Sequence, residues 1–306
     1  MRICIIGCGG MGSIFAAHLA RVHTLEVFAY DVWKEHVKAI NESGLRVTGE
    51  ANFTVEIEAT TDPKRIPRCD YGIVAARGMD TRNAIAGAAH LFDEKSAVCS
   101  IQNGVGNEEI LAEYVSHVIR GTTFAAGRVP EPGQVIYEIT GETWLGPFEP
   151  AHTPMKKVDE LAAALDRAGM ETIAVEDARG VQWTKLIFTS STFPVEALTL
   201  LHHRAATSFR PTGELLNSLL EEGGAVARAL GIQLHHDPKD AVRARAQAPG
   251  KHQASMMQDV LAGRATEVDF MNGAIVRSGE QAGIPTPLNR TLWALIKGIE
   301  HSWTHP

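Results

Sequence analysis

The chain has 306 residues, of which 44% are hydrophobic and 21% charged, and its formal net charge is −7. This length favours two domains, and the apolar fraction suffices for a sizeable core. The negative charge argues against a broad electrostatic grip on nucleic acid, and the apolar runs fall short of the ~18 residues that a membrane span needs. We therefore expect neither a nucleic-acid partner nor a membrane segment.

Cysteine usage and the N-terminus indicate the compartment. The four cysteines form no CxxC pair, which favours reduced, mostly buried thiols over a disulfide or zinc framework. The N-terminus carries no signal-peptide pattern. Both observations predict a cytoplasmic protein.

The first predicted element is a strand over 3–6, a short apolar run typical of strands buried on both faces. It leads directly into Gly7-x-Gly9-x-x-Gly12, and apolar residues then recur at helical spacing from Ile14 to Val22. A strand, a glycine-rich turn and a helix together are the context that the dinucleotide fingerprint requires. The alternative, a glycine-rich loop without a ligand, leaves this context unexplained.

Each glycine of the motif has a physical role. Gly7 allows the tight turn, Gly9 lets the pyrophosphate approach the backbone, and Gly12 lets the helix pack closely on the strand. The helix N-terminus offers N–H groups and a positive dipole end to phosphate. The predicted phosphate-binding residues also include Gly10 and Met11.

The second predicted strand, 25–30, is followed by Asp31, about where the acidic residue of the fingerprint belongs, ~20 residues on. Its carboxylate can accept hydrogen bonds from ribose hydroxyls and would repel a 2′-phosphate. No arginine follows immediately, and Lys34 is the nearest cation. NAD is therefore favoured over NADP. An aspartate that caps the next helix is the alternative, and that role is compatible with ribose binding.

Alternating strands and helices continue over about 125 residues and predict an α/β fold with a doubly wound parallel sheet of Rossmann type. Further strands are expected at 45–47, 53–57, 71–76, 97–101, 118–124 and 172–175. The first two alternate like an antiparallel excursion, and two more, at 134–139 and 142–145, have the pattern of antiparallel edge strands. Helices are expected at 33–43, 81–92, 107–115 and 158–168.

From Asp177 onward the pattern is almost wholly helical. Helices are expected at 181–191, 212–230, 238–247, 255–261, 268–282 and 288–302. We therefore place a dinucleotide-binding domain at residues 1–176 and a helical domain at residues 177–306.

Several side chains are candidates for chemistry. Ligands of open α/β sheets bind beyond the carboxyl ends of the strands, which selects the loops at Asp31, Arg77 and Asn103 besides the glycine turn. Lys185 stands among apolar neighbours, where a lowered pKa would let it exchange a proton near neutrality; the alternative is a lysine whose ammonium reaches the surface. Glu267, with Asp269, lies at a predicted helix start, where capping is the alternative role.

Two histidine pairs, His202-His203 and His235-His236, suggest a metal site only at first sight. Adjacent histidines on a helix point to different sides, and no carboxylate or cysteine completes a tetrahedral set. We therefore expect surface or packing roles and no metal.

Several motifs occur together in one order. They are Gly7-x-Gly9-x-x-Gly12, Asn103-Gly104, Gly121-Thr-Thr123, Lys185-Leu-Ile followed by Pro194, Ser255-Met-Met-Gln-Asp259 and Thr266-Glu267-Val-Asp269-Phe-Met-Asn272-Gly273. In this combination the chain resembles the ketopantoate reductase family over nearly its whole length. The C-terminal block is the most specific part, because many dehydrogenases share the glycine fingerprint.

The resemblance implies a Rossmann domain, a helical substrate and dimerisation domain in a homodimer, and reduction of a small-molecule 2-keto acid by nicotinamide. It makes Lys185 the general acid for the carbonyl oxygen, lets Glu267 and Ser255 hold the substrate, and places Asn103 near nicotinamide and substrate. These roles suit the chemistry, because negative charge grows on the carbonyl oxygen as hydride adds to its carbon.

The sequence departs from the family pattern at four positions. Thr189 and Phe193 stand where the family has substrate-side asparagines, Arg77 replaces a lysine, and Asp31 replaces a loop that accommodates a 2′-phosphate. Our leading hypothesis is thus an NAD-dependent 2-keto acid reductase, or 2-hydroxy acid dehydrogenase, for a less polar substrate.

Two alternatives remain. One is an NADPH-dependent ketopantoate reductase of pantothenate biosynthesis, with Thr189 and neighbouring waters replacing the asparagines. The other is a nucleotide-binding regulator without catalysis, against which the retained Lys185 argues.

Overall fold

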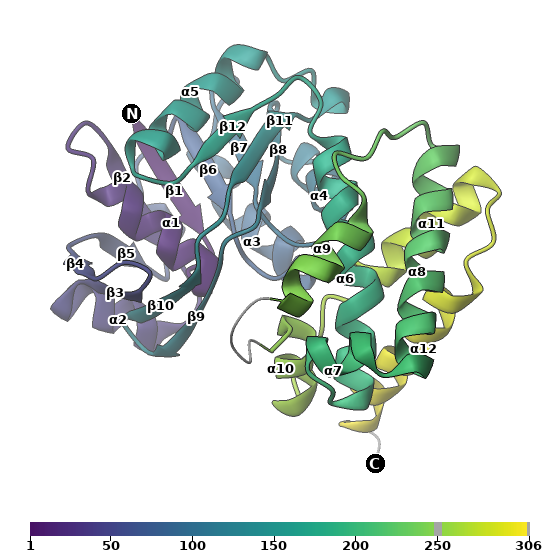
Figure 1. Cartoon of the computed structure of the whole chain (residues 1–306). Helices are drawn as coiled ribbons and strands as arrows, with labels where there is room; N and C mark the ends of the chain where they lie inside the picture. The colour runs from purple at the N-terminus through teal and green to yellow at the C-terminus, as the bar shows by residue number, and fades with distance from the viewer. Residues whose placement is uncertain (248–252, 305–306) are drawn as a thin grey trace. The chain divides into compact units, whose positions relative to one another are not determined.

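The computed structural model describes residues 1–247 and 253–304. The chain divides into two compact units: the first comprises residues 1–102 and 107–178, and the second comprises residues 103–106 and 179–306 (Figure 1). The division falls after Ala178, two residues beyond the boundary expected at Glu176. A four-residue segment from the first half of the sequence thus belongs to the second, helical unit.

The first unit is built on an eight-stranded sheet in the order β12-β11-β8-β7-β6-β1-β2-β5. Its six strands from β8 to β5 are parallel, and β11 and β12 run antiparallel to them. The predicted α/β class and doubly wound parallel sheet are confirmed. The bounds are β1 Arg2–Ile6, β2 Glu26–Tyr30, β5 Glu58–Thr60, β6 Tyr71–Val74, β7 Ala97–Ser100, β8 Val118–Thr123, β11 Thr143–Pro147 and β12 Thr172–Ala174.

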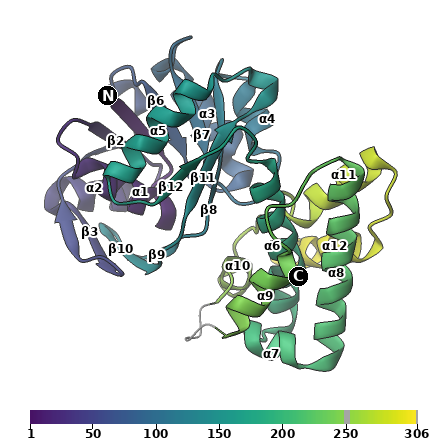
Figure 2. The same cartoon turned by 45° about the horizontal axis from the view of Figure 1, so that its top comes forward.

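Alternate residues of β1 supply the cores on the two faces of this sheet. Ile3 and Ile5 pack with apolar residues of α1 and α5, whereas Cys4 and Ile6 pack with those of α3 and α4. Figures 1 and 2 show these helices around the sheet. Burial on both faces explains the nearly continuous apolar run. The helices are α1 Gly10–Ala20, α2 Lys34–Ser43, α3 Thr81–Ala88, α4 Asn107–Ala112 and α5 Met155–Arg167.

A second, four-stranded sheet has the order β4-β3-β10-β9. β3 and β4 pair antiparallel, as predicted. The expectation of edge positions for β10 and β11 is wrong, because β10 lies between β3 and β9 and β11 lies between β8 and β12. Strand β9 was not predicted; it contains Pro130, which an edge strand tolerates. The bounds are β3 Leu45–Gly49, β4 Phe53–Val55, β9 Ala126–Glu131 and β10 Gln134–Ile139.

The second unit is helical, as predicted. Its longest helix, α6, packs against α8, α9, α10 and α12. The short α7 was not expected. The bounds are α6 Arg179–Thr199, α7 His203–Ser208, α8 Arg210–Ala229, α9 Pro238–Gln247, α10 Ser255–Leu261, α11 Asn272–Ala282 and α12 Pro287–Ser302.

Helix α6 runs eight residues past its expected end because Pro194 does not stop it. A proline has no N–H, so the carbonyl of Ser190 loses its usual helical partner. The side-chain amide of Asn272 donates to that carbonyl at 2.8 Å. This replacement bond satisfies the freed acceptor and ties the start of α11 to α6.

The cysteines and the apolar helices can be compared with what the composition predicted. All four cysteines are buried. Among residues 1–247 and 253–304, no helix is both long and apolar enough to cross a membrane.

Candidate active site

Two of the motif glycines are required by close packing within the first unit. Gly7 follows β1 with φ +90°, and a Cβ there would lie 2.6 Å from the backbone nitrogen of Ala76. A Cβ on Gly12 would lie 1.8 Å from the carbonyl oxygen of Gly7. Both distances are far below van der Waals contact, so Gly7 and Gly12 shape the strand–turn–helix connection itself.

Gly9 differs, because a Cβ there would meet no atom within 4 Å. Gly9 occupies the N-cap of α1 and no side-chain hydrogen bond caps that helix. An uncapped helix N-terminus with space at its N-cap residue suits a pyrophosphate. Gly10 itself packs on the second sheet, where its Cβ would lie 2.1 Å from the carbonyl oxygen of Gly127.

The Asp31 carboxylate joins the glycine turn to the next helix. One oxygen accepts the Cys8 N–H at 2.5 Å and the other accepts the Trp33 N–H at 2.7 Å. Two hydrogen bonds leave lone pairs on the carboxylate for ribose hydroxyls. The capping and ribose-binding interpretations are therefore compatible in this geometry.

Arg77 lies in the loop after β6, and β6, β1 and β2 are parallel neighbours. The residues that follow these strands are Arg77, Gly7 and Asp31, so they lie at one edge of the sheet. Crevices at that edge are where open α/β sheets bind ligands. The residues present thus fit a dinucleotide.

Within the second unit, Asn103, Lys185 and Glu267 form a hydrogen-bonded chain. The Lys185 ammonium donates to Asn103 Oδ1 at 2.9 Å, and Asn103 Nδ2 lies 3.4 Å from Glu267 Oε2. Asn103 is separated from Lys185 by 82 residues and from Glu267 by 164. The fold thus brings together the three residues that the sequence predicts as catalytic.

The segment that carries Asn103 is fixed by two residues that the sequence did not predict. The Val105 N–H donates to the carbonyl of Phe270 at 2.9 Å, and the Gln182 side-chain amide donates to the carbonyl of Gly104 at 3.3 Å. Gly104 has φ +87°, and a Cβ there would lie 2.2 Å from the Phe270 carbonyl oxygen. Gln182 precedes Lys185 by nearly one helical turn, and this spacing is the one feature of the sequence that could have indicated that Gln182 lies near the site.

The environment of Lys185 adjusts its proton affinity. Burial lowers the pKa of Lys185 to about 8, and the negative charge of Glu267 partly opposes this shift. Glu267 itself is buried. A lysine with a pKa near 8 is protonated at neutral pH and can release its proton at little cost.

The predicted substrate-side residues differ in their surroundings. Thr189 is buried, and its hydroxyl lies 2.9 Å from the carbonyl of Lys185 and 3.1 Å from that of Leu186, as is common for threonine within a helix. Ser255 is the first residue of α10, is half-buried, and lies on a helix that packs against α6. Phe193 is half-buried on α6.

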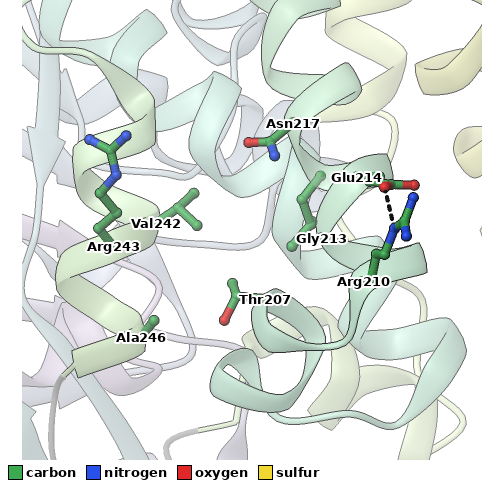
Figure 3. A pocket seen from close by; sticks show the side chains of 9 residues that line it. Thr207, Arg210, Gly213, Glu214, Asn217, Val242, Arg243 and Ala246 are labelled. Carbon is green, nitrogen blue, oxygen red and sulfur yellow. Dashed lines mark hydrogen bonds and ion pairs between the residues drawn. The ribbon is translucent and has the colours of Figure 1, made fainter.

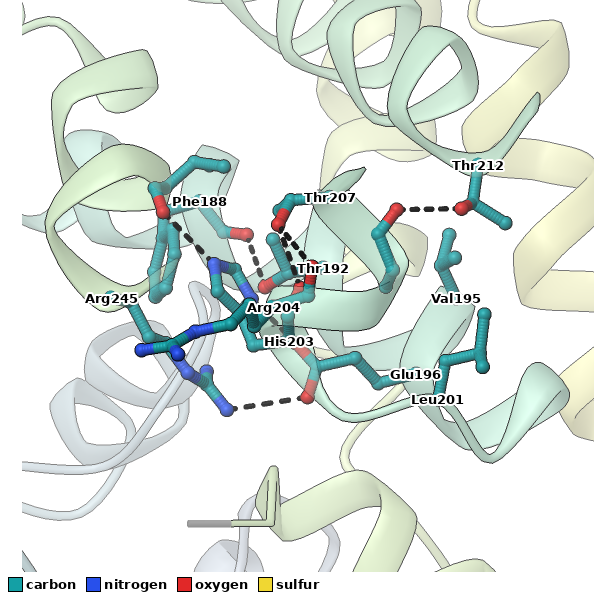
Figure 4. Close-up of polar contacts among 12 residues, drawn as sticks. Phe188, Thr192, Val195, Glu196, Leu201, His203, Arg204, Thr207, Thr212 and Arg245 are labelled. Carbon is teal, nitrogen blue, oxygen red and sulfur yellow. Dashed lines mark hydrogen bonds and ion pairs between the residues drawn. The ribbon is translucent and has the colours of Figure 1, made fainter. Parts of the chain in front are cut away.

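Arg245 of α9 lies over Phe193 and is a further residue that the sequence did not predict. Its guanidinium carbon is 5.2 Å from the ring centroid of Phe193 and 5.8 Å from that of Phe188. One guanidinium nitrogen lies 3.3 Å from the buried carboxylate of Glu196 (Figure 4). Burial lowers the pKa of Arg245, and Glu196 opposes this shift.

The histidine pairs take surface or packing positions, with His203 buried and both His235 and His236 exposed. His203 is buried, with one ring nitrogen 2.8 Å from Glu196 and the other 3.0 Å from the carbonyl of Val242. The rings of His235 and His236 lie 4.0 Å apart. In the part of the chain that the structure describes, no three histidine, cysteine, aspartate or glutamate side chains are placed to hold a metal ion.

A cavity of about 370 Å³ lies among α7, α8 and α9, and its lining contains none of the predicted site residues (Figure 3). At its rim Arg210 pairs with Glu214 at 2.8 Å, and Arg243 pairs with Asp240 of its own helix at 2.9 Å. Both arginines are thus already neutralised by exposed partners. The lining residues are Thr207, Arg210, Gly213, Glu214, Leu216, Asn217, Val242, Arg243 and Ala246.

An enzyme that transfers hydride to a carbonyl group needs a place for a dinucleotide and a group that gives a proton to oxygen. The open glycine turn of the first unit is a candidate for the first of these, and Lys185 of the second unit is a candidate for the other. These features define the chain as a nicotinamide-dependent oxidoreductase.

Comparison with known families identifies it further. The family model described as "Ketopantoate reductase PanE/ApbA" matches residues 3–150, and the model of the C-terminal part of the same family matches residues 177–300. The chain belongs to the ketopantoate reductase family, as its motifs indicated. It is an NAD(P)-dependent oxidoreductase of ketopantoate-reductase type that acts on CH–OH groups and their carbonyl counterparts.

Curated relatives match over almost the whole chain. The 2-dehydropantoate 2-reductase of Archaeoglobus fulgidus is 31% identical over 303 residues, and that of Pyrococcus abyssi is 32% identical over 306 residues. In both comparisons the match covers 98% of this chain and 98% of the relative.

Solved structures agree on the fold. A PanE/ApbA family ketopantoate reductase from Ralstonia eutropha JMP134 is 30% identical, with a TM-score of 0.91 over 100% of both chains. D-mandelate dehydrogenase, solved with NADH and anilino(oxo)acetate, is 24% identical, with a TM-score of 0.89 over 99% of this chain and 100% of that chain. At that identity the likeness shows the fold alone.

Proposed function

We propose that the protein reduces the carbonyl group of a 2-keto acid, or oxidises the matching 2-hydroxy acid, with Lys185 as the general acid and base. The observation that carries this proposal is the hydrogen bond of 2.9 Å from Lys185 to Asn103, in surroundings that lower the lysine pKa to about 8. A proton donor with a pKa near the working pH is effective in both directions.

The roles of the residues follow from their contacts. During reduction the Lys185 ammonium stabilises the negative charge that develops on the carbonyl oxygen and gives its proton to that oxygen; in oxidation the neutral amine accepts the hydroxyl proton. Asn103 orients the ammonium through its side-chain oxygen. Glu267 opposes the pKa lowering of Lys185. The family resemblance, and not a contact in the structure, is the reason for proposing that Glu267 and Ser255 bind the substrate.

The cofactor is NAD in this proposal. A nicotinamide dinucleotide bound at the glycine turn would supply or accept the hydride. The Asp31 carboxylate retains lone pairs for ribose hydroxyls, and its charge disfavours a 2′-phosphate. The residues assigned to the cofactor are Gly7, Gly9, Gly10, Met11, Gly12, Asp31, Arg77 and Asn103.

The substrate side chain is apolar, aromatic or aliphatic, in this proposal. Between Gly180 and Ala197 of α6, the residues that are not buried are Lys185, Phe188 and Phe193. Apart from Lys185, the proposed proton donor, the side chains that this part of α6 leaves accessible are therefore aromatic. Arg245 lies over both rings with its charge balanced by Glu196, so it presents no free cation beside them.

A second candidate is reduction of 2-dehydropantoate with NADPH, which the names of the archaeal relatives favour. In this version Thr189, whose hydroxyl oxygen keeps accepting capacity, and neighbouring waters replace the family's asparagines. A hydroxylated substrate would then lose one hydrogen-bond partner at Phe193, and such losses reduce kcat/KM strongly.

A paired substrate screen separates the two candidates. Purified protein is assayed with NADH and NADPH against 2-dehydropantoate, phenylglyoxylate and 4-methyl-2-oxopentanoate, alongside Phe193→Asn and a control, Phe209→Asn, whose ring is exposed at the start of α8. We expect NADH and an apolar keto acid to give the highest kcat/KM. We expect Phe193→Asn to raise the kcat/KM for 2-dehydropantoate and Phe209→Asn to leave it unchanged.

Two outcomes would contradict the leading proposal. Efficient NADPH-dependent reduction of 2-dehydropantoate by the wild type would establish the second candidate. Equal turnover of 2-dehydropantoate by the wild type and Phe193→Asn would show that Phe193 does not select the substrate.

We also propose a homodimer formed through the second unit and a cytoplasmic location. Family resemblance supports the dimer, and buried thiols at all four cysteines suit a reducing compartment. Light scattering of the purified protein tests the dimer, and a single-chain mass at micromolar concentration would exclude it.

A further inference from the structure

Glu267 lies outside regular secondary structure, in the turn before α11. The turn is closed by its own backbone, since the Phe270 and Met271 N–H groups donate to the Glu267 carbonyl at 3.0 and 3.1 Å. Side chains of α12 add contacts to the residues on both sides of Glu267.

On the N-terminal side of Glu267, the support comes from Glu300. Its carboxylate oxygen Oε1 accepts both the N–H and the hydroxyl of Thr266, each at 2.7 Å. The Thr266 hydroxyl oxygen in turn accepts the Val268 N–H at 3.3 Å. The backbone on both sides of Glu267 is thus linked to a single carboxylate of α12.

On the C-terminal side, the support passes through Asp269. One carboxylate oxygen accepts the indole N–H of Trp293 at 2.6 Å, and the other accepts the Lys297 ammonium at 3.0 Å. Lys297 also lies 2.7 Å from Glu300, so it joins the two carboxylates that hold the turn. Without this cation two negative charges would face one another across the turn.

The spacing on α12 fits this task. Trp293, Lys297 and Glu300 occupy positions i, i+4 and i+7, which lie on one face of a helix. Burial tends to lower the pKa of Lys297, but hydrogen bonds to Glu300 and Asp269 raise it above its usual value. The ammonium therefore remains charged throughout the pH range in which Lys185 titrates.

We propose that Lys297, with Trp293 and Glu300, is a positioning residue that holds the Glu267 turn so that the Glu267 carboxylate stays beside Asn103 and acts on Lys185. This inference rests on the proposed role of Glu267 in the reaction. It assigns to α12, far along the chain from the glycine turn, a part in setting the proton affinity of the proposed catalytic lysine.

The test compares Lys297→Met with Arg290→Met as a matched control. Arg290 also lies on α12, and its guanidinium pairs with Glu280 of α11. We expect Lys297→Met to lower kcat/KM by about tenfold to a hundredfold, since small displacements of catalytic groups have effects of this size. We expect Lys297→Arg to retain most activity, because arginine can bridge two carboxylates.

Three readouts separate positioning from simple loss of stability. The basic limb of the pH profile for reduction should move to lower pH in Lys297→Met, because Glu267 is the charged group that raises the pKa of Lys185. Glu267→Gln should shift that limb in the same direction. In the Glu267→Gln background, Lys297→Met should cause little further loss, since residues that act as a unit are not additive.

Failure of this inference is distinguishable from failure of the proposed function. Full activity of Glu267→Gln would remove the role of Glu267 and with it the basis of the proposal. Impaired Glu267→Gln beside a Lys297→Met that matches Arg290→Met in kcat/KM and pH profile would overturn the positioning role alone. Additive losses in the double variant would also overturn it.

Discussion

The glycine turn of the first unit (residues 7–12) and the lysine cluster of the second unit (Lys185, Asn103 and Glu267) are built in opposite ways. The glycine turn is formed by neighbouring residues, offers backbone N–H groups at the start of α1, and depends on the absence of side chains. The lysine cluster uses side chains from three distant parts of the sequence and depends on their hydrogen bonds and charges.

This contrast explains how each region responds to change. A site made of backbone groups tolerates a larger residue only where space remains around the glycine. Gly7 and Gly12 have no such space and shape the fold, whereas Gly9 has space that a ligand could use. A site made of side chains tolerates substitutions of neighbouring residues as long as these do not displace its charged groups.

The largest effect is expected at Lys185. Lys185→Ala removes the proposed proton donor, and we expect kcat to fall by about 10²- to 10⁴-fold, the usual contribution of general acid–base catalysis. Dinucleotide binding, measured by fluorescence titration with NADH, should remain, because the glycine turn belongs to the other unit. Unchanged turnover would exclude Lys185 as the general acid. Lost NADH binding would show that the glycine turn does not bind the dinucleotide independently of Lys185.

The glycines of the turn should separate fold from binding. A Cβ on Gly12 would lie 1.8 Å from a carbonyl oxygen, so Gly12→Ala should destabilise the protein by about 3 kcal/mol or more. Gly9→Ala meets nothing within 4 Å, so its melting temperature should match that of the wild type while the Kd for NADH rises about tenfold, or 1.4 kcal/mol. Equal NADH affinity in Gly9→Ala and wild type would show that no phosphate approaches this residue.

The half-buried Lys185 should lower the stability of the protein. Its pKa falls from 10.5 in the unfolded chain to about 8 in the folded one, so below pH 8 the folded state carries a penalty of about 3 kcal/mol. Lys185→Met should therefore unfold at higher guanidinium concentration than the wild type at pH 7. This difference should shrink between pH 8 and 10.5, where the folded lysine loses its proton first.

The exposed Lys38, replaced by methionine, serves as the control for this stability measurement. It should show no such gain at any pH. An equal gain in Lys38→Met would indicate that added apolar surface, rather than relief of a buried charge, causes the stabilisation.

The smallest effect is expected at Asp31. Asp31→Asn removes the charge and keeps one oxygen, which can accept one of the two backbone N–H groups that the carboxylate binds. We expect the preference for NAD over NADP, measured as the ratio of kcat/KM values, to narrow by about tenfold. Asp31→Ala should narrow the ratio similarly but lower stability as well, because the N–H groups of Cys8 and Trp33 lose their acceptor. An unchanged ratio in Asp31→Asn would mean that another residue sets the preference.

Much of the fold was predictable because its signals are local. Apolar runs such as Ile3–Ile6 and glycines such as Gly44, which ends α2 with φ +76°, act within a few residues of their own position. The errors occurred where distant contacts override local preference. Helix α6 continues through Pro194 because Asn272 supplies the missing partner, and the antiparallel β11 lies inside its sheet because β12 adds to its other edge.

Residue type and short-range spacing were enough to predict the dinucleotide fingerprint and the α/β class, and the resemblance to the ketopantoate reductase family supplied the roles expected of Lys185, Asn103 and Glu267. Only the tertiary structure decided that Asn103–Gly106 belongs to the helical unit, that Arg245 lies over Phe193, and that α12 holds the turn of Glu267. These relations join residues that are far apart in the chain, and no local preference records which distant side chain will satisfy a charge or a hydrogen bond.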